Sequence, residues 1–292
     1  MHLDLSKEPP EASLSDEKVE KVLACLADKN WSAHTRRELP LLEVQQIHGL
    51  LNFVAMVLVA GRMHLTFTVM ALGVASKRGS ATLTKGWAEE LDWWRRVVSK
   101  WNRVALLFPP EYALSPFSFD DSPATDACRS KEKLEGGAGG FFLGFYWFFS
   151  FTELECATLD IYELEGYTMC LFLDTMLRIC PEKISGRRFR MRNDNMAWVT
   201  VVGTNKAKGK PVIAFLLNWL HEMMARFSFT IHLDYVQTDL NYLADPLSRL
   251  QIERFLREAR THWSATLPLV RLQVPDRYSV SSQLISLKSS IG

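Results

Sequence analysis

Strand-like and helical segments alternate along the chain after residue 123, and this alternation constrains the fold more than any other feature. The segments expected as strands are short and apolar, whereas those expected as helices are longer and carry apolar residues three or four positions apart. Strands separated by helices are typical of a sheet covered by helices, not of a helical bundle. We therefore predict an α/β domain over residues 123–260.

The same patterns predict the individual elements of this domain. Strands are expected in a short segment that ends at Asp126, in the apolar run 139–151, and in residues 188–194 and 229–236. Helices are expected over residues 161–178, 196–202, 212–227 and 240–260, with a loop at 206–210. Residues 261–292 have strand-like patches but no clear place in this scheme, so they are expected to form a C-terminal extension.

The first part of the chain, residues 1–107, has a helical pattern instead. Helices are expected over residues 15–28, 41–59 and 87–101. In the third, Trp87, Leu91, Trp94 and Val98 are three or four positions apart, which is typical of a helix face packed in a core. Residues 108–122 are rich in Pro, Ser and aromatic residues and are predicted to link the two parts.

The composition is that of a globular protein. Hydrophobic residues make up 48% of the 292 residues and charged residues 23%, which is enough apolar material for two domains with cores. The formal net charge is only +1, so any surface that attracts nucleic acid has to be local.

Cysteine usage and hydropathy bear on the compartment. The five cysteines are scattered without a Cys-x-x-Cys pair, which favours a reduced intracellular protein of the cytoplasm or nucleus. The apolar runs 50–60 and 139–151 are shorter than the ~20 residues of a membrane-spanning helix. We therefore expect no membrane association.

Four acidic residues lie near the ends of expected elements. Asp126 and Asp194 end expected strands, where open α/β sheets place their sites, and Glu165 and Asp245 lie near the starts of expected helices. Carboxylate oxygens suit hard cations such as Mg²⁺. A pair of such ions can activate water and stabilise the leaving oxygen of a phosphodiester, so convergence of the four would predict phosphodiester hydrolysis.

Each acid also has a simpler interpretation when taken alone. Asp194 and Asp245 each precede an expected helix and could be N-cap residues. Glu163 and Glu165 could be first-turn acids that favour the helix dipole. Only their joint pattern indicates a site.

That joint pattern resembles a known family. Asp194-Asn-Met-Ala resembles the Asp-Asn-x-Ala of retroelement ribonuclease H, and Asn241-Tyr-Leu-Ala-Asp-Pro-Leu-Ser-Arg249 resembles its Asn-x-x-Ala-Asp-x-Leu-Ser-Arg. Ile161-x-x-Leu-Glu165 is similar to the helix signature, and the preceding Leu favours Glu165 over Glu163 as the ligand. Thr125-Asp-Ala, followed by the glycines of residues 137–140, resembles the opening hairpin.

The resemblance extends upstream to cover about residues 15–250. Residues 50–54, 61–62, 91–94 and 101–102 are similar to the thumb and connection region of DIRS-like and LTR-type reverse transcriptases. The polymerase palm with its Tyr-x-Asp-Asp motif has no counterpart in this sequence. The resemblance therefore implies no polymerase activity for this chain, and it leaves open whether another chain supplies a reverse-transcriptase palm.

The resemblance implies an α/β fold with an RNase H-like mixed sheet flanked by helices, preceded by a mainly helical thumb/connection region. It also implies an endonuclease that hydrolyses the RNA strand of RNA/DNA hybrids with two Mg²⁺ ions, for which Mn²⁺ can substitute. Asp126, Glu165, Asp194 and Asp245 would be the catalytic residues and the metal ligands. This sequence departs from the family pattern in a charged stretch at residues 128–135, and in carrying Tyr235 or Val236 where relatives have a His.

A hybrid substrate also requires positive charge near the site, because it is recognised through shape, phosphates and 2′-hydroxyls. Two groups of basic residues are candidates for phosphate contact: Arg188, Arg190 and Arg192, and Lys206, Lys208 and Lys210. The simpler alternative is a solvated strand and a polar loop.

Two other functions remain open from the sequence. The chain could be a catalytically inactive, truncated retroelement fragment that acts as a nucleic-acid-binding or structural module. It could also be another nuclease or an integrase on the same fold, because a fold does not determine the substrate.

Overall fold

The computed structural model describes residues 1–7, 10–27, 37–101, 103–106, 117–204, 207, 210–274 and 276–289. The chain divides into two compact units. One unit comprises Met1–Phe108 and His221–Phe229, and the other comprises Pro109–Leu220 and Thr230–Gly292.

The first unit is mainly helical, as predicted. Its helices are α1 (Asp16–Ala27), α2 (Leu41–Val54), α3 (Thr66–Arg78) and α4 (Lys85–Lys100), with a 3-10 segment, Val59–Leu65, before α3. Short antiparallel strands accompany them: β1 (His2–Asp4), β2 (Glu11–Ser13) and β5 (Val104–Leu106) form one sheet, and β3 (Glu38–Pro40) pairs with β4 (Ser80–Thr82). The helix expected over residues 41–59 ends earlier, at Val54.

Helix α4 carries the largest side chains of this core. The hydroxyl of Thr84 caps the helix by accepting a hydrogen bond from the backbone N–H of Trp87. The predicted face of Trp87, Leu91, Trp94 and Val98 is buried, so this stripe packs in the core.

The second unit is built on a six-stranded mixed sheet with the order β10-β9-β6-β7-β8-β11. Its strands are β6 (Ala124–Ser130), β7 (Glu135–Phe142), β8 (Phe145–Ser150), β9 (Arg188–Asn193), β10 (Thr230–Tyr235) and β11 (Val270–Arg271). Strands β6, β7 and β8 form an antiparallel meander, whereas β6, β9 and β10 are parallel. The predicted α/β fold, with an RNase H-like mixed sheet flanked by helices, is confirmed.

Two strand predictions need correction. The apolar run 139–151 forms parts of two strands, because Leu143 and Gly144 adopt positive φ angles of 49° and 83° and reverse the chain. Asp126 does not end its strand but lies inside β6, which continues to Ser130.

The charged stretch 128–135 lengthens the β6–β7 hairpin. The strands remain in register from Asp126, opposite Gly139, to Ser130, opposite Glu135, and residues 131–134 make the turn. The stretch is therefore absorbed at the tip of the hairpin, and Asp126 keeps its place beside Gly139.

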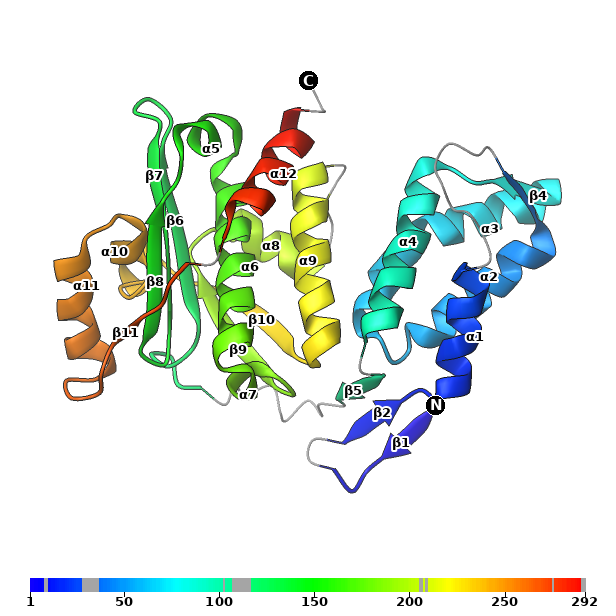
Figure 1. The fold of residues 1–292 in the computed structure, drawn as a ribbon, viewed down its shortest axis with the longest axis horizontal. Coiled ribbons are helices and arrows are strands. Elements are labelled where there is room, and N and C mark those ends of the chain that lie inside the picture. Colours follow the sequence, from blue (N-terminus) through cyan, green and yellow to red (C-terminus); the bar gives the residue numbers. More distant parts are fainter. Residues whose placement is uncertain are drawn as a thin grey trace. The chain divides into compact units, whose positions relative to one another are not determined.

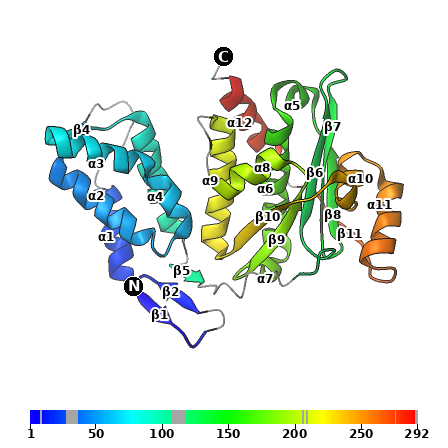
Figure 2. The same ribbon diagram turned by 180° about the vertical axis from the view of Figure 1, so that it is seen from behind.

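Helices cover both faces of the sheet in this unit (Figure 1). One face is covered by α5 (Glu153–Thr158) and α6 (Ile161–Ile179), and the other by α10 (Asp245–Ser248) and α11 (Ile252–Glu258), as Figure 2 shows from behind. The remaining helices that follow α6 are α7 (Pro181–Ile184), α8 (Met196–Thr204) and α9 (Pro211–Phe227).

The helix expected over residues 240–260 is broken. A 3-10 turn at Thr238–Leu240, α10, α11 and a π-helical turn at Ala259–Trp263 replace it. Leu250 has a φ of 59°, which ends α10 and redirects the chain before α11. The break leaves α10 as a single turn that packs on the sheet.

Residues of the C-terminal extension add to the second unit. Strand β11 pairs in parallel with β8, and helix α12 (Tyr278–Ser289) packs on α5. Arg277 forms a buried ion pair with Glu155, with Nη1 at 2.6 Å from Oε1. No helix in the described part of the chain is long and apolar enough to cross a membrane.

Candidate metal centre

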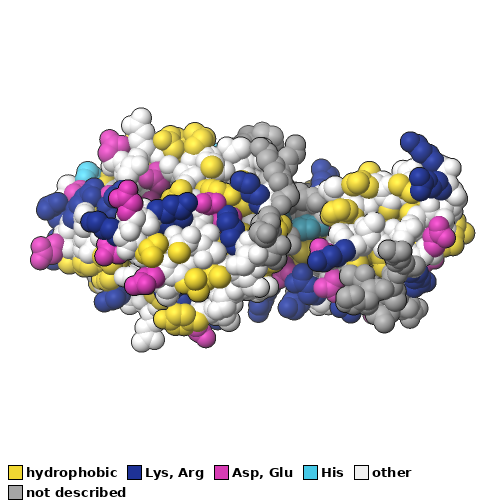
Figure 3. Space-filling model, turned by 90° about the horizontal axis from the view of Figure 1, so that it is seen from above, with side chains coloured by type: hydrophobic (Ala, Val, Ile, Leu, Met, Phe, Trp, Pro, Cys, Tyr) yellow, Lys and Arg dark blue, Asp and Glu magenta, His cyan; other side chains and the backbone are white. Residues whose placement is uncertain are grey.

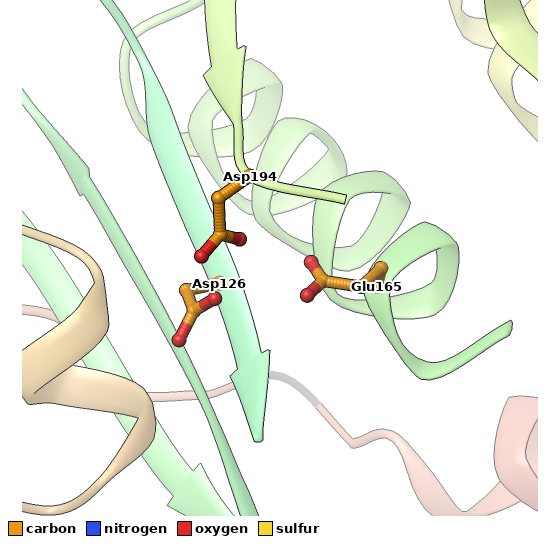
Figure 4. A group of neighbouring side chains, drawn as sticks. All are labelled: Asp126, Glu165 and Asp194. Atoms are coloured by element: carbon orange, nitrogen blue, oxygen red, sulfur yellow. The ribbon is translucent and has the colours of Figure 1, made fainter. Parts of the chain in front are cut away.

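Three carboxylates from three separate elements converge in the second unit (Figure 4). Asp126 comes from the central strand β6, Glu165 from the second turn of α6, and Asp194 from the residue after β9. One oxygen of each lies within 4.8 Å of one oxygen of each of the others. This group could hold a metal ion.

Strand register brings the two aspartates together. In the parallel pair β6–β9, Ala124 lies opposite Arg192. Asp126 lies two residues after Ala124, and Asp194 lies two residues after Arg192. Because side chains alternate between the two faces of a sheet, both aspartates project from the same face at neighbouring positions. The tertiary pairing, rather than the end of a strand, therefore sets their distance.

Glu165 reaches the group from a helix whose start is firmly capped. Asp160 and Glu163 form a capping box at the N-terminus of α6, which sets the helix phase. Glu165 lies about one and a half helical turns after Asp160. This position is on the buried side of the helix, and Glu165 is only 2% exposed. The helix thus directs this carboxylate toward the sheet.

The two candidate glutamates have different partners. Glu163 bonds to the backbone N–H of Asp160, and its Oε1 lies 2.9 Å from Nζ of Lys288. Glu165 instead faces Asp126 and Asp194. Of the alternatives that the sequence left open, Glu165 is therefore the member of the carboxylate group.

Neighbouring polar groups orient the carboxylates. Nδ2 of Asn193 donates to Oε2 of Glu165 at 2.9 Å, and the hydroxyl of Ser248 donates to Asp126. The side chain of Asn195 accepts hydrogen bonds from the N–H groups of Ala197 and Trp198 and so caps α8. Asn195, and not Asp194, therefore performs the capping role, which leaves the carboxylate of Asp194 available.

Burial and mutual repulsion raise the pKa values within this group. Burial raises the pKa of Asp126 from its ordinary value of 3.8 to about 8, and the charge of Asp194 adds to the shift, while the Ser248 hydrogen bond opposes it. Burial also raises the pKa of Glu165 well above 4.5, and the charges of Asp126 and Asp194 raise it further. In the described residues, no Lys or Arg forms an ion pair with any of the three.

The donor set fits a hard divalent cation. All three groups offer carboxylate oxygens, which Mg²⁺ and Mn²⁺ prefer over the nitrogen and sulfur ligands typical of zinc sites. Two buried acids and a half-buried one at this separation are costly without a cation, because each disfavours the ionised form of the others.

Asp245, the fourth predicted carboxylate, lies close by but is held differently. Its Oδ1 accepts from Nε of Arg249 at 2.6 Å, and its Oδ2 accepts from Nη1 of Arg254 at 2.8 Å. Its charge contributes to the raised pKa of Asp126. Asp245 is the first residue of α10, and the N-cap residue of this helix is Ala244. The structure thus brings three of the four together and pairs the fourth with arginines.

The predicted basic residues lie in varied environments. Arg188 is half-buried, and Arg190 pairs with Asp234, with Nε at 2.6 Å from Oδ2. Arg192 is only 1% exposed, and its guanidinium lies 4.2 Å from the ring centroid of Phe119. In this structure, burial therefore keeps the guanidinium of Arg192 away from any ligand at the surface.

The lysine group is only partly described. Lys206 and Lys208 lie outside the described residues. Lys210 is exposed, and its Nζ lies 2.9 Å from the hydroxyl of Tyr162, near the start of α6. Lys and Arg side chains are mixed with Asp and Glu on the face drawn in Figure 3, so positive charge there is local rather than a single broad patch.

Sequence reasoning missed several residues of this site. Asn193 was not singled out, although it adjoins Asp194 and holds Glu165. Ser248 and Arg249 belonged to the recognised Leu-Ser-Arg motif, but their partners Asp126 and Asp245 could not be assigned from the motif. Arg254 had no sequence signal, because it meets Asp245 only through the turn at Leu250.

Comparisons with known proteins add little. No protein-family model matches the sequence, and no curated protein matches it. Among solved structures, the chain is similar to the foamy viral protease-reverse transcriptase dRH in complex with double-stranded DNA, with a TM-score of 0.24 and 15% identity. The match covers 77% of this chain and 35% of that chain, so this chain spans about a third of that polypeptide. A likeness of this degree carries no conclusion about fold or activity.

Proposed function

We propose that this chain is a metal-dependent ribonuclease H that hydrolyses the RNA strand of RNA/DNA hybrids. The observation that carries the proposal is the convergence of Asp126, Glu165 and Asp194, within 4.8 Å and without a basic partner among the described residues. They converge on a mixed sheet of the RNase H type.

The three carboxylates would hold two Mg²⁺ or Mn²⁺ ions, with the remaining positions filled by water and by oxygens of the substrate phosphate. Such ions supply Lewis acidity that activates water and neutralises charge on the phosphodiester and its leaving oxygen. Asp126 and Glu165 must be ionised to bind the metal ions, because only the carboxylate form is a metal ligand.

The surrounding residues would keep the ligands in position. Asn193 holds Oε2 of Glu165 and so fixes the orientation of this carboxylate. Ser248 holds one oxygen of Asp126 from the opposite face of the sheet. These contacts reduce the freedom of each carboxylate, and such neighbours are important for metal affinity.

The substrate class follows from the resemblance of the sequence motifs to those of retroelement ribonuclease H. A hybrid duplex is bound through its shape, phosphates and 2′-hydroxyls rather than its sequence, so a few local cations are sufficient. The half-buried Arg188 and the exposed Lys210 are the candidates, and Lys206 and Lys208 are proposed to add to them.

The test is cleavage of a labelled RNA/DNA hybrid by the whole chain with Mg²⁺ or Mn²⁺, compared with duplex DNA and duplex RNA. We expect cleavage of the hybrid alone, and loss of cleavage in Asp194→Asn. Asp174→Asn removes an acid from a surface ion pair on α6 and is the matched control, which should retain activity.

Two outcomes would contradict the proposal. Binding of the hybrid without cleavage under any divalent cation would favour a catalytically inactive nucleic-acid-binding module. Equal cleavage of duplex DNA would indicate another nuclease on the same fold.

A further inference from the structure

The carboxylate of Asp245 forms ion pairs with two arginines, Arg249 and Arg254. Arg249 precedes the chain reversal at Leu250, and Arg254 follows it. Nε of Arg249 and Nη1 of Arg254 each bond to a different oxygen of this carboxylate. We propose that Arg249 and Arg254 form a phosphate-binding pair beside the candidate metal centre, and that Asp245 is the residue that positions them. That the phosphate belongs to a nucleic acid rests on the proposed function.

Exposure separates the roles of the three side chains. The side chain of Asp245 is 4% exposed, whereas those of Arg249 and Arg254 are 47% and 36% exposed. A buried carboxylate with both oxygens satisfied is a fixed anchor. The guanidinium groups extend from it to the surface, where a ligand can reach them.

Each arginine retains unused donors. A guanidinium has five N–H donors in a planar fork that matches phosphate geometry. Arg249 bonds to Asp245 through Nε, which leaves its terminal nitrogens, and Arg254 bonds to Asp245 and Gln251 through Nη1 alone. Two guanidinium charges against one carboxylate also leave a net positive charge at this point.

The backbone is shaped to bring the two arginines together. Arg249 follows α10, Leu250 has a φ of 59°, and Arg254 lies in the first turn of α11. A non-glycine residue in the left-handed region is strained. Without that reversal a continuous helix would separate residues 249 and 254 by more than one turn, and they could not share one carboxylate.

The pair lies next to the metal centre. Ser248, the residue before Arg249, bonds to Asp126 through its hydroxyl, which also lies 2.9 Å from the carbonyl oxygen of Asp245. The pKa of the Arg249 guanidinium is raised, first by its hydrogen bond to Asp245 and also by the charge of Asp126. A phosphate held by the pair would therefore lie near the three carboxylates.

The test measures binding without catalysis. The whole chain is titrated against a fluorescent RNA/DNA hybrid in EDTA at several salt concentrations, and the salt slope of the affinity is determined. We expect Arg249→Gln and Arg254→Gln each to weaken binding about three- to tenfold and to reduce the slope by about one, as the loss of one phosphate contact does.

The matched control is Arg257→Gln, which removes the same charge from an exposed residue of α11 that pairs with Glu258. The control should bind within about twofold of the unaltered chain. Equal weakening by all three variants would overturn the inference, because it would show a general charge effect. Failure of the unaltered chain to bind the hybrid would overturn it as well.

Asp245→Asn tests the positioning role. We expect this variant to weaken hybrid binding and to lower its salt slope while its Mn²⁺ affinity, measured by calorimetry, stays within about threefold of the unaltered chain. Loss of Mn²⁺ affinity as large as that of Asp194→Asn would assign Asp245 to the metal and overturn its role as an anchor. If the hybrid is never cleaved but these binding differences persist, the proposed function fails and the phosphate-binding pair stands.

Discussion

The hydroxyl of Ser248 donates a hydrogen bond to the carboxylate of Asp126, which joins the short helix α10 to the central strand of the sheet. This bond favours the ionised carboxylate and opposes the effect of burial on the pKa of Asp126. Its partners are 122 residues apart in the sequence, and the bond ties one metal-ligand candidate to the Leu-Ser-Arg motif.

Ser248→Ala should weaken metal binding at neutral pH. Without the hydrogen bond the pKa of Asp126 rises further, so more protein carries a protonated Asp126 that cannot bind metal. We expect a loss of about tenfold in Mn²⁺ affinity at pH 7, since a hydrogen bond to a charged group contributes about 1.5–3 kcal/mol. Calorimetry at pH 7 and pH 9 checks this, because the loss should shrink at the higher pH.

Ser76→Ala is the matched control for this substitution. Ser76 is an exposed residue of α3 that bonds only to its own helix, at the carbonyl of Leu72. Its loss should leave metal affinity unchanged. An equal effect of the two substitutions, or no effect of Ser248→Ala at either pH, would contradict the role assigned to the Ser248 hydroxyl.

Gly139→Ala should disturb the site through the backbone. Gly139 lies opposite Asp126, and a Cβ placed there would lie 2.7 Å from the backbone nitrogen of Ser248 and closer still to Cβ of Leu247. Helix α10 would have to move away from the sheet, so we expect a destabilisation of about 1–3 kcal/mol in urea unfolding and weaker metal binding. Gly203→Ala, with open space around its Cβ, should be neutral or stabilise by about 0.5–1 kcal/mol. Similar stability of the two variants would be inconsistent with close packing of α10.

Substitutions of the two glutamates of α6 should have different effects, one on metal binding and the other on helix stability. Glu165→Gln is expected to abolish high-affinity metal binding, because Glu165 belongs to the carboxylate group. Glu163→Gln should retain it but lower the free energy of unfolding by about 0.5–2 kcal/mol, because it removes the Lys288 ion pair and replaces a charged acceptor in the capping bond with a neutral one. Calorimetry and urea unfolding of both variants provide the check. The reverse pattern would assign the ligand to Glu163.

The metal-free protein should lose stability as the pH rises. The folded-state pKa of Asp126 is about 8, against an ordinary value of 3.8, so folding favours its protonated form. The contribution of Asp126 to the free energy of unfolding is fully present below about pH 4 and is lost as the pH rises through 8. Its size is about 1.4 kcal/mol for each unit by which the pKa differs between the folded and unfolded protein. The raised pKa of Glu165 acts in the same direction.

Urea unfolding in EDTA at pH 5, 7 and 9 measures this dependence. Asp126→Asn should flatten the curve and be more stable than the unaltered chain at pH 9. Mg²⁺ should restore stability at high pH, because it binds the ionised carboxylates of the folded state. A metal-free protein that becomes more stable between pH 5 and pH 9 would contradict the burial of an uncompensated acid at this position.

Much of the fold could be predicted from local patterns. Apolar residues at helical spacing located α4 and α6 to within a few residues, because a long amphipathic helix repeats its signal over many turns. The β7–β8 turn was missed because both strands are apolar and the run is uninterrupted except by Leu143 and Gly144. The break in residues 240–260 was missed because the left-handed conformation falls on Leu250, a residue that seldom adopts it.

The sequence by itself determined an α/β fold and a set of acids, since hydrophobic period and short motifs are local properties of the chain. Tertiary structure decided which acids meet. Parallel pairing of β6 with β9 brings Asp126 close to Asp194, and the phase of α6 turns Glu165, rather than Glu163, toward them. The chain reversal at Leu250 allows Asp245 to pair with two arginines. Each of these depends on register or on a turn between distant segments. No local pattern of residues encodes such a distance, because contacts made across the sheet determine it.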